Sequence, residues 1–126
     1  MFIPTIKDIK NNIKVNNDLI ETANQFIYDN AEKEGDFVFQ YNCISKLLEY
    51  KRKTLLNALI IKGMIWSYLL NGKEEDKRRK FWLYVKLYNH TKVIKQTLEN
   101  IRMLKGGLVS LQIMMNPLGA LSLKKM

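Results

Sequence analysis

Apolar residues recur at seven-residue intervals in two long stretches of the chain, and this pattern is typical of packed helices. The first series consists of Ile6, Ile13, Ile20 and Ile27, with Ile9 and Ala23 at intermediate positions. It predicts a helix from about residue 5 to about residue 33. Pro4 fits the start of this helix, and the tripeptide EGD at 34–36 fits its end. Asn16 interrupts the stripe, and such a polar residue most often sets the register of helix packing.

The second series lies in the C-terminal half of the chain. It consists of Leu87, Ile94, Ile101, Leu108 and Met115, with Leu98, Leu104 and Leu111 between them. It predicts a very long helix over about 74–115, in which Glu74, Glu75 and Asp76 form the first turn, where the helix dipole favours acids. Gly106-Gly107 is a weak point that costs about 1 kcal/mol per glycine relative to alanine. The dipeptide Asn116-Pro117 ends the helix, because proline disfavours a helical conformation of the residue before it.

A third predicted helix lies between the two series, over about 38–71. Its first half is polar and basic, whereas LLNALIIKGMIWSYLL at 55–70 is apolar on nearly every side. A helix of that kind is covered by neighbouring helices or by lipid. Asn71-Gly72 ends it. The sequence therefore predicts one all-α domain over 1–126, in which a long antiparallel hairpin (38–71 and 74–115) packs with the N-terminal helix (5–33) as a bundle or coiled coil.

The apolar helix also bears on assembly. In a bundle of three helices, the central helix is covered only in part. A contiguous exposed apolar surface usually marks an interface. We therefore expect a homo-oligomer or an obligate complex. The residues predicted to form the heptad seams and interfaces are Ile6, Ile13, Ile20, Ile27, Ile61, Ile65, Leu87, Ile94, Ile101, Leu108 and Met115.

The formal net charge is +9, and it is unevenly distributed along the chain. Residues 1–36 carry four lysines against seven acids, whereas residues 77–126 carry eleven bases against a single acid, Glu99. Such asymmetry predicts an anionic partner, which can be a phosphate backbone, an anionic lipid or an acidic protein surface. A rod of cations can neutralise several phosphates at once, so we expect contact with nucleic-acid phosphates without base readout. The residues predicted to bind nucleic acid are Lys77, Arg78, Arg79, Lys80, Lys86, Lys92, Lys95 and Arg102.

The aromatic residues in KEEDKRRKFWLYVKLYNH, at 73–90, have two interpretations. In the first, the segment from Phe81 to Tyr88 packs against the preceding apolar helix, with Tyr84 and either Leu87 or Tyr88 on the core-facing side. In the second, Trp82 or an outward tyrosine stacks on an unpaired base. We favour a core position for Trp82. In both, the side chains expected to point largely away from the core are those of Arg78, Lys92 and Lys95.

Catalytic and metal-binding patterns are missing from the sequence. His90 is the only histidine and Cys43 the only cysteine, so an internal disulfide is impossible. Glycine-rich nucleotide-binding motifs and paired metal-binding histidines do not occur. We expect His90 to be a partly buried hydrogen-bonding residue and Cys43 to be a small apolar residue. The expectation is a non-enzymatic protein without a cofactor or a metal ion.

Two further segments concern location. The stretch GGLVSLQIMMNPLGALSL at 106–123 is uncharged, but its length is marginal and its polar content high for a membrane span. The first residues, MFIPTIKDIKNN, lack the long apolar core of a signal peptide. We therefore expect a cytoplasmic location, or one within a virion or a nucleoprotein particle, and no membrane partner.

In outline, a long hairpin with a basic second arm resembles small basic helical phage proteins that assemble into rings, such as the recombination mediators that help load a recombinase on single-stranded DNA. The resemblance assigns no role to any individual residue. The leading hypothesis is a non-enzymatic accessory subunit that contacts nucleic-acid phosphates within an oligomer or a nucleoprotein assembly. The alternative is a structural protein, such as a small virion component, that docks an acidic protein surface. A second alternative is a membrane-surface protein that uses residues 106–126.

Overall fold

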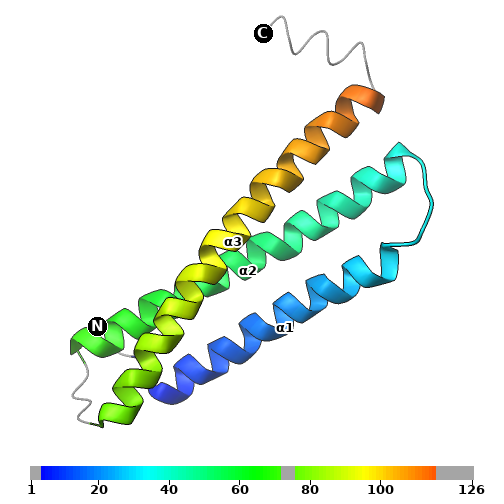
Figure 1. The fold of residues 1–126 in the computed structure, drawn as a ribbon. Helices are drawn as coiled ribbons and strands as arrows, with labels where there is room; N and C mark the ends of the chain where they lie inside the picture. Colours follow the sequence, from blue (N-terminus) through cyan, green and yellow to red (C-terminus); the bar gives the residue numbers. More distant parts are fainter. Residues whose placement is uncertain (1–3, 72–75, 116–126) are drawn as a thin grey trace, which may run out of the picture.

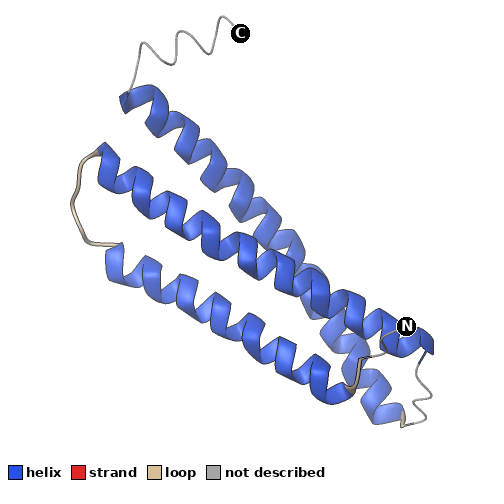
Figure 2. Ribbon diagram, turned by 180° about the vertical axis from the view of Figure 1, so that it is seen from behind, coloured by secondary structure: helices blue, strands red, loops and turns tan. Residues whose placement is uncertain are grey.

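Three long helices make up nearly all of the structure, a computed structural model that describes residues 4–71 and 76–115 (Figure 1). The helices are α1 (Ile6–Asn30), α2 (Phe37–Asn71) and α3 (Lys77–Met115). The described residues contain no strand (Figure 2). The predicted all-α fold, a helical hairpin with an N-terminal helix packed along it, is confirmed. α3 continues through Gly106-Gly107 without a break.

Side-chain caps place the start of α1. The Thr5 hydroxyl accepts a hydrogen bond from the Asp8 backbone N–H at 3.1 Å, and the Asp8 carboxylate accepts one from the Thr5 N–H at 2.9 Å. This reciprocal arrangement satisfies two backbone donors that the first turn leaves without helical partners. The same hydrogen bonds hold the pKa of Asp8 below its ordinary value, because they favour the ionised carboxylate.

The other two helix starts correct the predicted boundaries. Asp36 does not end α1, which stops at Asn30; instead its carboxylate accepts a hydrogen bond from the Phe39 N–H at 2.9 Å and caps α2. Asp76 precedes the first turn of α3 and caps it through the Arg78 N–H at 2.9 Å. Both aspartates lie just before a helix because their carboxylates accept hydrogen bonds from backbone N–H groups of the first turn, which have no partner within the helix. The predicted first-turn acids Glu74 and Glu75 lie outside the described residues.

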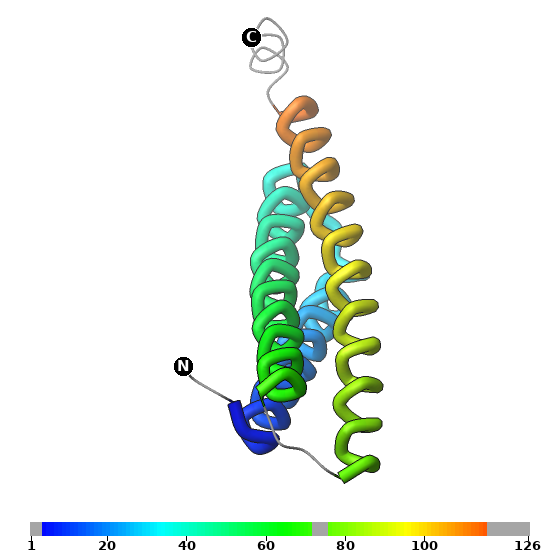
Figure 3. Tube along the Cα trace, turned by 90° about the vertical axis from the view of Figure 1, so that its left-hand side faces the viewer, coloured from blue at the N-terminus to red at the C-terminus, as the bar shows by residue number. Residues whose placement is uncertain are grey.

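The central element of the bundle is α2, against which α1 and α3 both pack in antiparallel fashion (Figures 1 and 3). Among the described residues, no Cα atom of α1 lies within 8 Å of a Cα atom of α3. Long side chains bridge the two outer helices, since the Lys10 ammonium of α1 lies 5.5 Å from the ring centroid of Trp82 in α3. α2 therefore carries most of the packing, and on its far side the described part of the chain places no further helix.

The main apolar core lies at the end of the bundle where α1 and α3 begin and α2 ends. It contains Ile9, Ile61, Ile65, Leu83 and Leu87, with half-buried Ile6, Ile13, Met64, Tyr68, Leu69 and Trp82 around it. Three of the predicted seam residues, Ile61, Ile65 and Leu87, are thus buried within the chain's own bundle. Burial of each large aliphatic side chain contributes about 1.5–3 kcal/mol to the free energy of unfolding.

The buried seam of α1 is shifted from the predicted series. Its fully buried residues are Ile9, Asn16 and Ala23, again seven residues apart, and the series that begins at Ile6 runs beside them. Ile6, Ile13 and Ile20 are half-buried, whereas Ile27 is 43% exposed. The intermediate positions of the predicted stripe therefore face α2 most directly.

In α3 the heptad series was placed correctly in part. Ile101 is buried, Ile94 and Leu108 are half-buried, and Met115 is 40% exposed. The prediction that Leu98 lies on the seam is wrong, because its side chain is 52% exposed and Thr97 occupies the buried position. A shift of one residue turns a side chain by about 100° around the helix axis, which separates these neighbours.

Polar residues occupy buried positions in all three helices. The Asn16 side-chain amide donates to the Thr54 carbonyl at 3.1 Å and links α1 to α2. His90 is 6% exposed, and its Nδ1–H donates to the Lys86 carbonyl at 2.8 Å. Burial lowers the pKa of His90, so the neutral imidazole is favoured. The predicted hydrogen-bonding role of His90 within the bundle is confirmed.

Candidate nucleic-acid interface

A line of cationic and aromatic side chains follows the face of α3 that points away from the bundle. Its members recur at steps of three, four or seven residues, which keeps them on one side of a helix. We call this surface the outward stripe of α3, and its residues are Lys77, Phe81, Tyr84, Tyr88, Lys92, Lys95 and Arg102. All seven are exposed. At 1.5 Å per residue, the outward stripe of α3 is about 38 Å long.

The aromatic members correct the sequence-based interpretation. Tyr84 was expected on the core-facing side together with either Leu87 or Tyr88, but Tyr84 and Tyr88 are 56% and 61% exposed, and Phe81 is 71% exposed. Leu83, Leu87 and His90 occupy the core-facing positions instead. Because Tyr84 and Tyr88 each follow a buried leucine by one residue, they are turned by about 100° toward solvent. The expectation that Lys92 and Lys95 point away from the core is confirmed.

Trp82 lies beside the outward stripe of α3 rather than on it. The indole is half-buried against the apolar core, and the ammonium groups of Lys10 and Lys86 lie 5.5 and 5.8 Å from its ring centroid. Cations over an indole face are stabilising, since the ring quadrupole attracts them. The favoured core position of Trp82 agrees with this packing, and its ring face is already used by lysines of the same chain.

The eight predicted cations do not form a single line. Four of them, Lys77, Lys92, Lys95 and Arg102, lie on the outward stripe of α3. Arg78, Arg79 and Lys80 are exposed around the first turn, and Lys86 is half-buried beside Trp82. Lys10 was not predicted, because it reaches this region from α1, and no pattern in the sequence shows which residues of separate helices meet.

One acid interrupts the positive charge of this face. Glu99 accepts from Arg102, with a carboxylate oxygen 3.4 Å from a guanidinium nitrogen, and both side chains are exposed. A solvent-exposed pair of this kind is worth about 0–1 kcal/mol. The Arg102 guanidinium is therefore free to exchange Glu99 for another anion at small energetic cost. A second contact within the outward stripe is that of the Lys92 ammonium, which lies 4.6 Å from the Tyr88 ring centroid.

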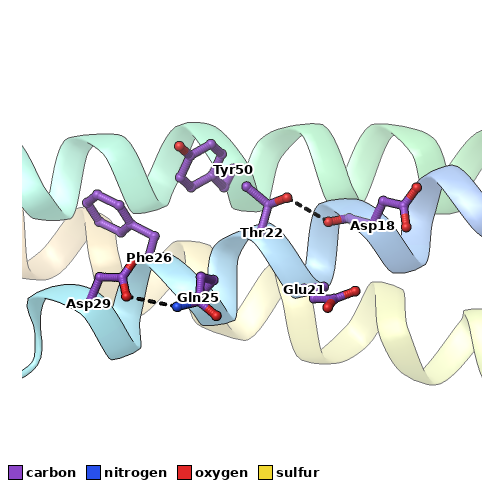
Figure 4. A pocket seen from close by; sticks show the side chains of 7 residues that line it. All are labelled: Asp18, Glu21, Thr22, Gln25, Phe26, Asp29 and Tyr50. Atoms are coloured by element: carbon purple, nitrogen blue, oxygen red, sulfur yellow. Dashed lines mark hydrogen bonds between the residues drawn. The ribbon is translucent and has the colours of Figure 1, made fainter.

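A groove of opposite character lies between α1 and α2 (Figure 4). It has a volume of about 510 Å³ and is lined by Asp18, Glu21, Thr22, Gln25, Phe26, Asp29 and Tyr50. Two lining groups are satisfied locally: the Thr22 hydroxyl donates to the Asp18 carbonyl, and the Gln25 amide donates to the Asp29 carboxylate, both at 2.8 Å. Within residues 4–71 and 76–115, no group of three or more His, Cys, Asp or Glu side chains is placed to hold a metal ion.

The helices bear on a membrane span, but not on the alternative of a membrane-surface protein. Within the part of the chain that the structure describes, none of the helices has the length and apolar character that crossing a membrane requires. Most of the segment 106–126 that this alternative invokes, from residue 116 onward, lies outside the described residues. Comparison of the chain with protein-family models, with curated proteins and with solved structures found no match.

Proposed function

We propose that the protein is a non-enzymatic, basic helical subunit that binds nucleic acid by its phosphates along the outward stripe of α3. It works within an oligomer or a larger nucleoprotein assembly, in the cytoplasm or in a particle. The observation that carries this proposal is the combination of four exposed cations and three exposed aromatic rings on one face of a helix. A core helix has no structural need for three exposed aromatic side chains in succession, since each leaves apolar area in water.

The geometry favours phosphate contact over base recognition. Lys77 and Arg102 lie at the two ends of a stripe about 38 Å long, so its cations can meet successive phosphates along a backbone. Contacts of this kind fix position without carrying sequence information. The exposed rings of Phe81, Tyr84 and Tyr88 offer apolar faces on which unpaired bases of any identity can stack.

Salt dependence tests the proposal directly. Binding of fluorescently labelled single strands and duplexes, each in two unrelated sequences, is measured by anisotropy over a range of salt concentrations. If four cations each displace a counterion, the slope of log K against log salt is between about −3 and −4. The affinity is expected to be nearly the same for the unrelated sequences. Absence of binding at low salt contradicts the proposal and favours an acidic protein surface as the partner of α3.

Glu99 provides a matched test of opposite sign. Replacing Glu99 with Gln removes the only acid of α3 and releases Arg102 from its ion pair, while the length and polarity of the side chain are kept. Affinity for nucleic acid is therefore expected to rise by up to about tenfold at low salt. Asp18→Gln on α1, which also removes one exposed negative charge, is the control and leaves the affinity nearly unchanged. Equal effects of both variants show that only net charge matters.

A further inference from the structure

The face of α2 that is turned away from the core carries its own apolar surface. We call it the outer face of α2, and its large members are Leu56, Leu59, Ile60, Trp66 and Leu70, which are 62%, 48%, 46%, 44% and 76% exposed. They lie three, four or seven residues from Gly63, which places them on one side of the helix, opposite buried Ala58, Ile61 and Ile65. Gly63 lies at the centre of this surface. A Cβ atom at that position has no described atom within 4 Å.

Charge is scarce on this part of the chain. Between Thr54 and Asn71 the sequence has one charged residue, Lys62, and it is half-buried. The chain as a whole carries a net charge of +9. Two copies that approach through the basic face of α3 bring like charges together, whereas the outer face of α2 presents none of its own. Like charges opposed across an interface cost several kcal/mol, so the outer face of α2 is a surface through which copies can meet at low electrostatic cost.

Four of the five large members of the outer face of α2 are also placed symmetrically in sequence about Gly63, whereas the counterpart of Leu59 is Ser67. Leu56 and Leu70 lie seven residues before and after it, and Ile60 and Trp66 lie three residues before and after it. A two-fold axis perpendicular to the helix at Gly63 therefore places Leu56 opposite Leu70 of a second copy and Ile60 opposite its Trp66. Self-complementarity of this kind is the requirement for an isologous interface.

We propose that two copies of this chain associate through the outer face of α2, with their α2 helices antiparallel and crossing at Gly63. Glycine at the crossing removes the side chain that otherwise separates two helix backbones, which favours close packing. Together, the exposed fractions of the five side chains amount to the surface of nearly three fully exposed large side chains per copy. On the scale of 150–250 Å² for a large side chain, two copies bury about 1,000 Å², the lower limit for a specific interface. Interfaces at this lower limit are typical of weak or transient complexes, so we expect the dimer to be reversible.

This inference specifies the oligomeric part of the proposed function, but it uses no residue of the outward stripe of α3. Its test is accordingly made without nucleic acid. Sedimentation velocity over a hundredfold range of concentration is expected to show a reversible monomer–dimer equilibrium for the parent protein. Gly63→Glu places two carboxylates at the axis and is expected to raise the dissociation constant at least tenfold, even though it lowers the repulsive net charge.

Gly106→Glu is the matched control, because Gly106 is also a helical glycine with no described atom within 4 Å of an added Cβ. It makes the same change in net charge and in helix propensity, and it is expected to leave dimerisation unimpaired. A parent protein that stays monomeric at every concentration overturns the proposal. So does a dimer that responds equally to Gly63→Glu and Gly106→Glu, since its contact then lies elsewhere.

Cross-linking tests the antiparallel arrangement. In a Cys43→Ser background, Leu56→Cys and Leu70→Cys variants are each treated with a short bismaleimide, alone and as a mixture. An antiparallel dimer is expected to give covalent dimers in the mixture and few in either variant alone. Cross-linking of each variant with itself, with no covalent dimer between the two variants in the mixture, shows a parallel arrangement and refutes the crossing at Gly63.

Discussion

Replacement of three cations on the outward stripe of α3 separates nucleic-acid binding from folding. Lys92, Lys95 and Arg102 are all exposed, and among the described residues the one ion pair that their exchange to Gln breaks is that between Arg102 and Glu99. That exposed pair is worth about 0–1 kcal/mol, and Gln is nearly as good a helix former as Lys or Arg. The triple Gln variant is therefore expected to keep the helicity of the parent protein and a free energy of unfolding within about 1 kcal/mol of it.

The effect on binding is much larger. Each neutralised phosphate contributes about 0.7 to the salt slope for a single strand and about 0.9 for a duplex, so three lost contacts reduce the slope by about 2–3. If the variant and the parent bind equally at 1 M salt, a linear extrapolation of log K against log salt gives about 10²- to 10³-fold weaker binding by the variant at 0.1 M salt. One remaining cation of the outward stripe, Lys77, leaves a shallow residual slope of about −1.

Fluorescence anisotropy at several salt concentrations measures both the slope and the affinity, and circular dichroism checks that the helices are intact. A second triple variant, Lys7→Gln with Lys14→Gln and Lys33→Gln, is the control, because it removes the same net charge from exposed positions outside α3. The control is expected to bind within severalfold of the parent protein. If the α3 variant binds as tightly as the parent at physiological salt, the outward stripe of α3 does not contact phosphates.

The remaining predictions concern stability. Trp82→Ala is expected to lower the free energy of unfolding in urea by about 2–4 kcal/mol, because a half-buried indole and its two lysine contacts are lost. If the variant instead binds single strands more weakly and keeps its stability, Trp82 stacks on bases. Burial lowers the pKa of His90, so the unfolded chain gains a proton that the folded chain resists. The contribution of neutral His90 to the free energy of unfolding is therefore fully present above pH 6.5, the ordinary pKa. Below that pH the free energy of unfolding falls by at most about 1.4 kcal/mol per pH unit. His90→Gln is expected to flatten this pH dependence between about pH 7 and pH 5. Asn16→Ala is expected to cost about 1–3 kcal/mol in urea unfolding, since it removes the buried amide bonded to Thr54, and a neutral result means that the amide carries no net stability. Gly106→Ala is expected to stabilise the protein by about 1 kcal/mol, visible as a higher Tm, because the added methyl meets no described atom within 4 Å.

The helices themselves were predictable from the sequence. The buried residues of α1 are still spaced by seven, although they belong to a series that begins at Ile9 and not at Ile6. The boundaries were less certain, because an aspartate between two helices can end the first or cap the second. Asp36 and Asp76 both cap the helix that follows, and only the geometry of the turn decides between these roles.

The faces of α3 were harder to assign. Its buried seam contains His90 and Thr97, two polar residues that a search for apolar periodicity passes over, whereas exposed Leu98 satisfies that search. Polar residues can occupy a seam when a local carbonyl accepts their hydrogen, as the Lys86 carbonyl does for His90. Tyr84 was assigned to the core-facing side, although the neighbouring Leu83 is the residue that is buried there. The outward positions of Lys92 and Lys95 were predicted correctly.

For α2, composition alone does not distinguish the two apolar sides. LLNALIIKGMIWSYLL contains the residues that form the core and also those that remain in water, and only the positions of α1 and α3 separate the two groups. The two proposals then use different helices, α3 for a polyanion and α2 for a second copy. They are nevertheless linked by charge, because two chains of +9 repel each other when they associate, and a bound polyanion reduces that repulsion. Coupling between two binding equilibria is reciprocal, so a polyanion that strengthens the dimer is itself bound more tightly by it.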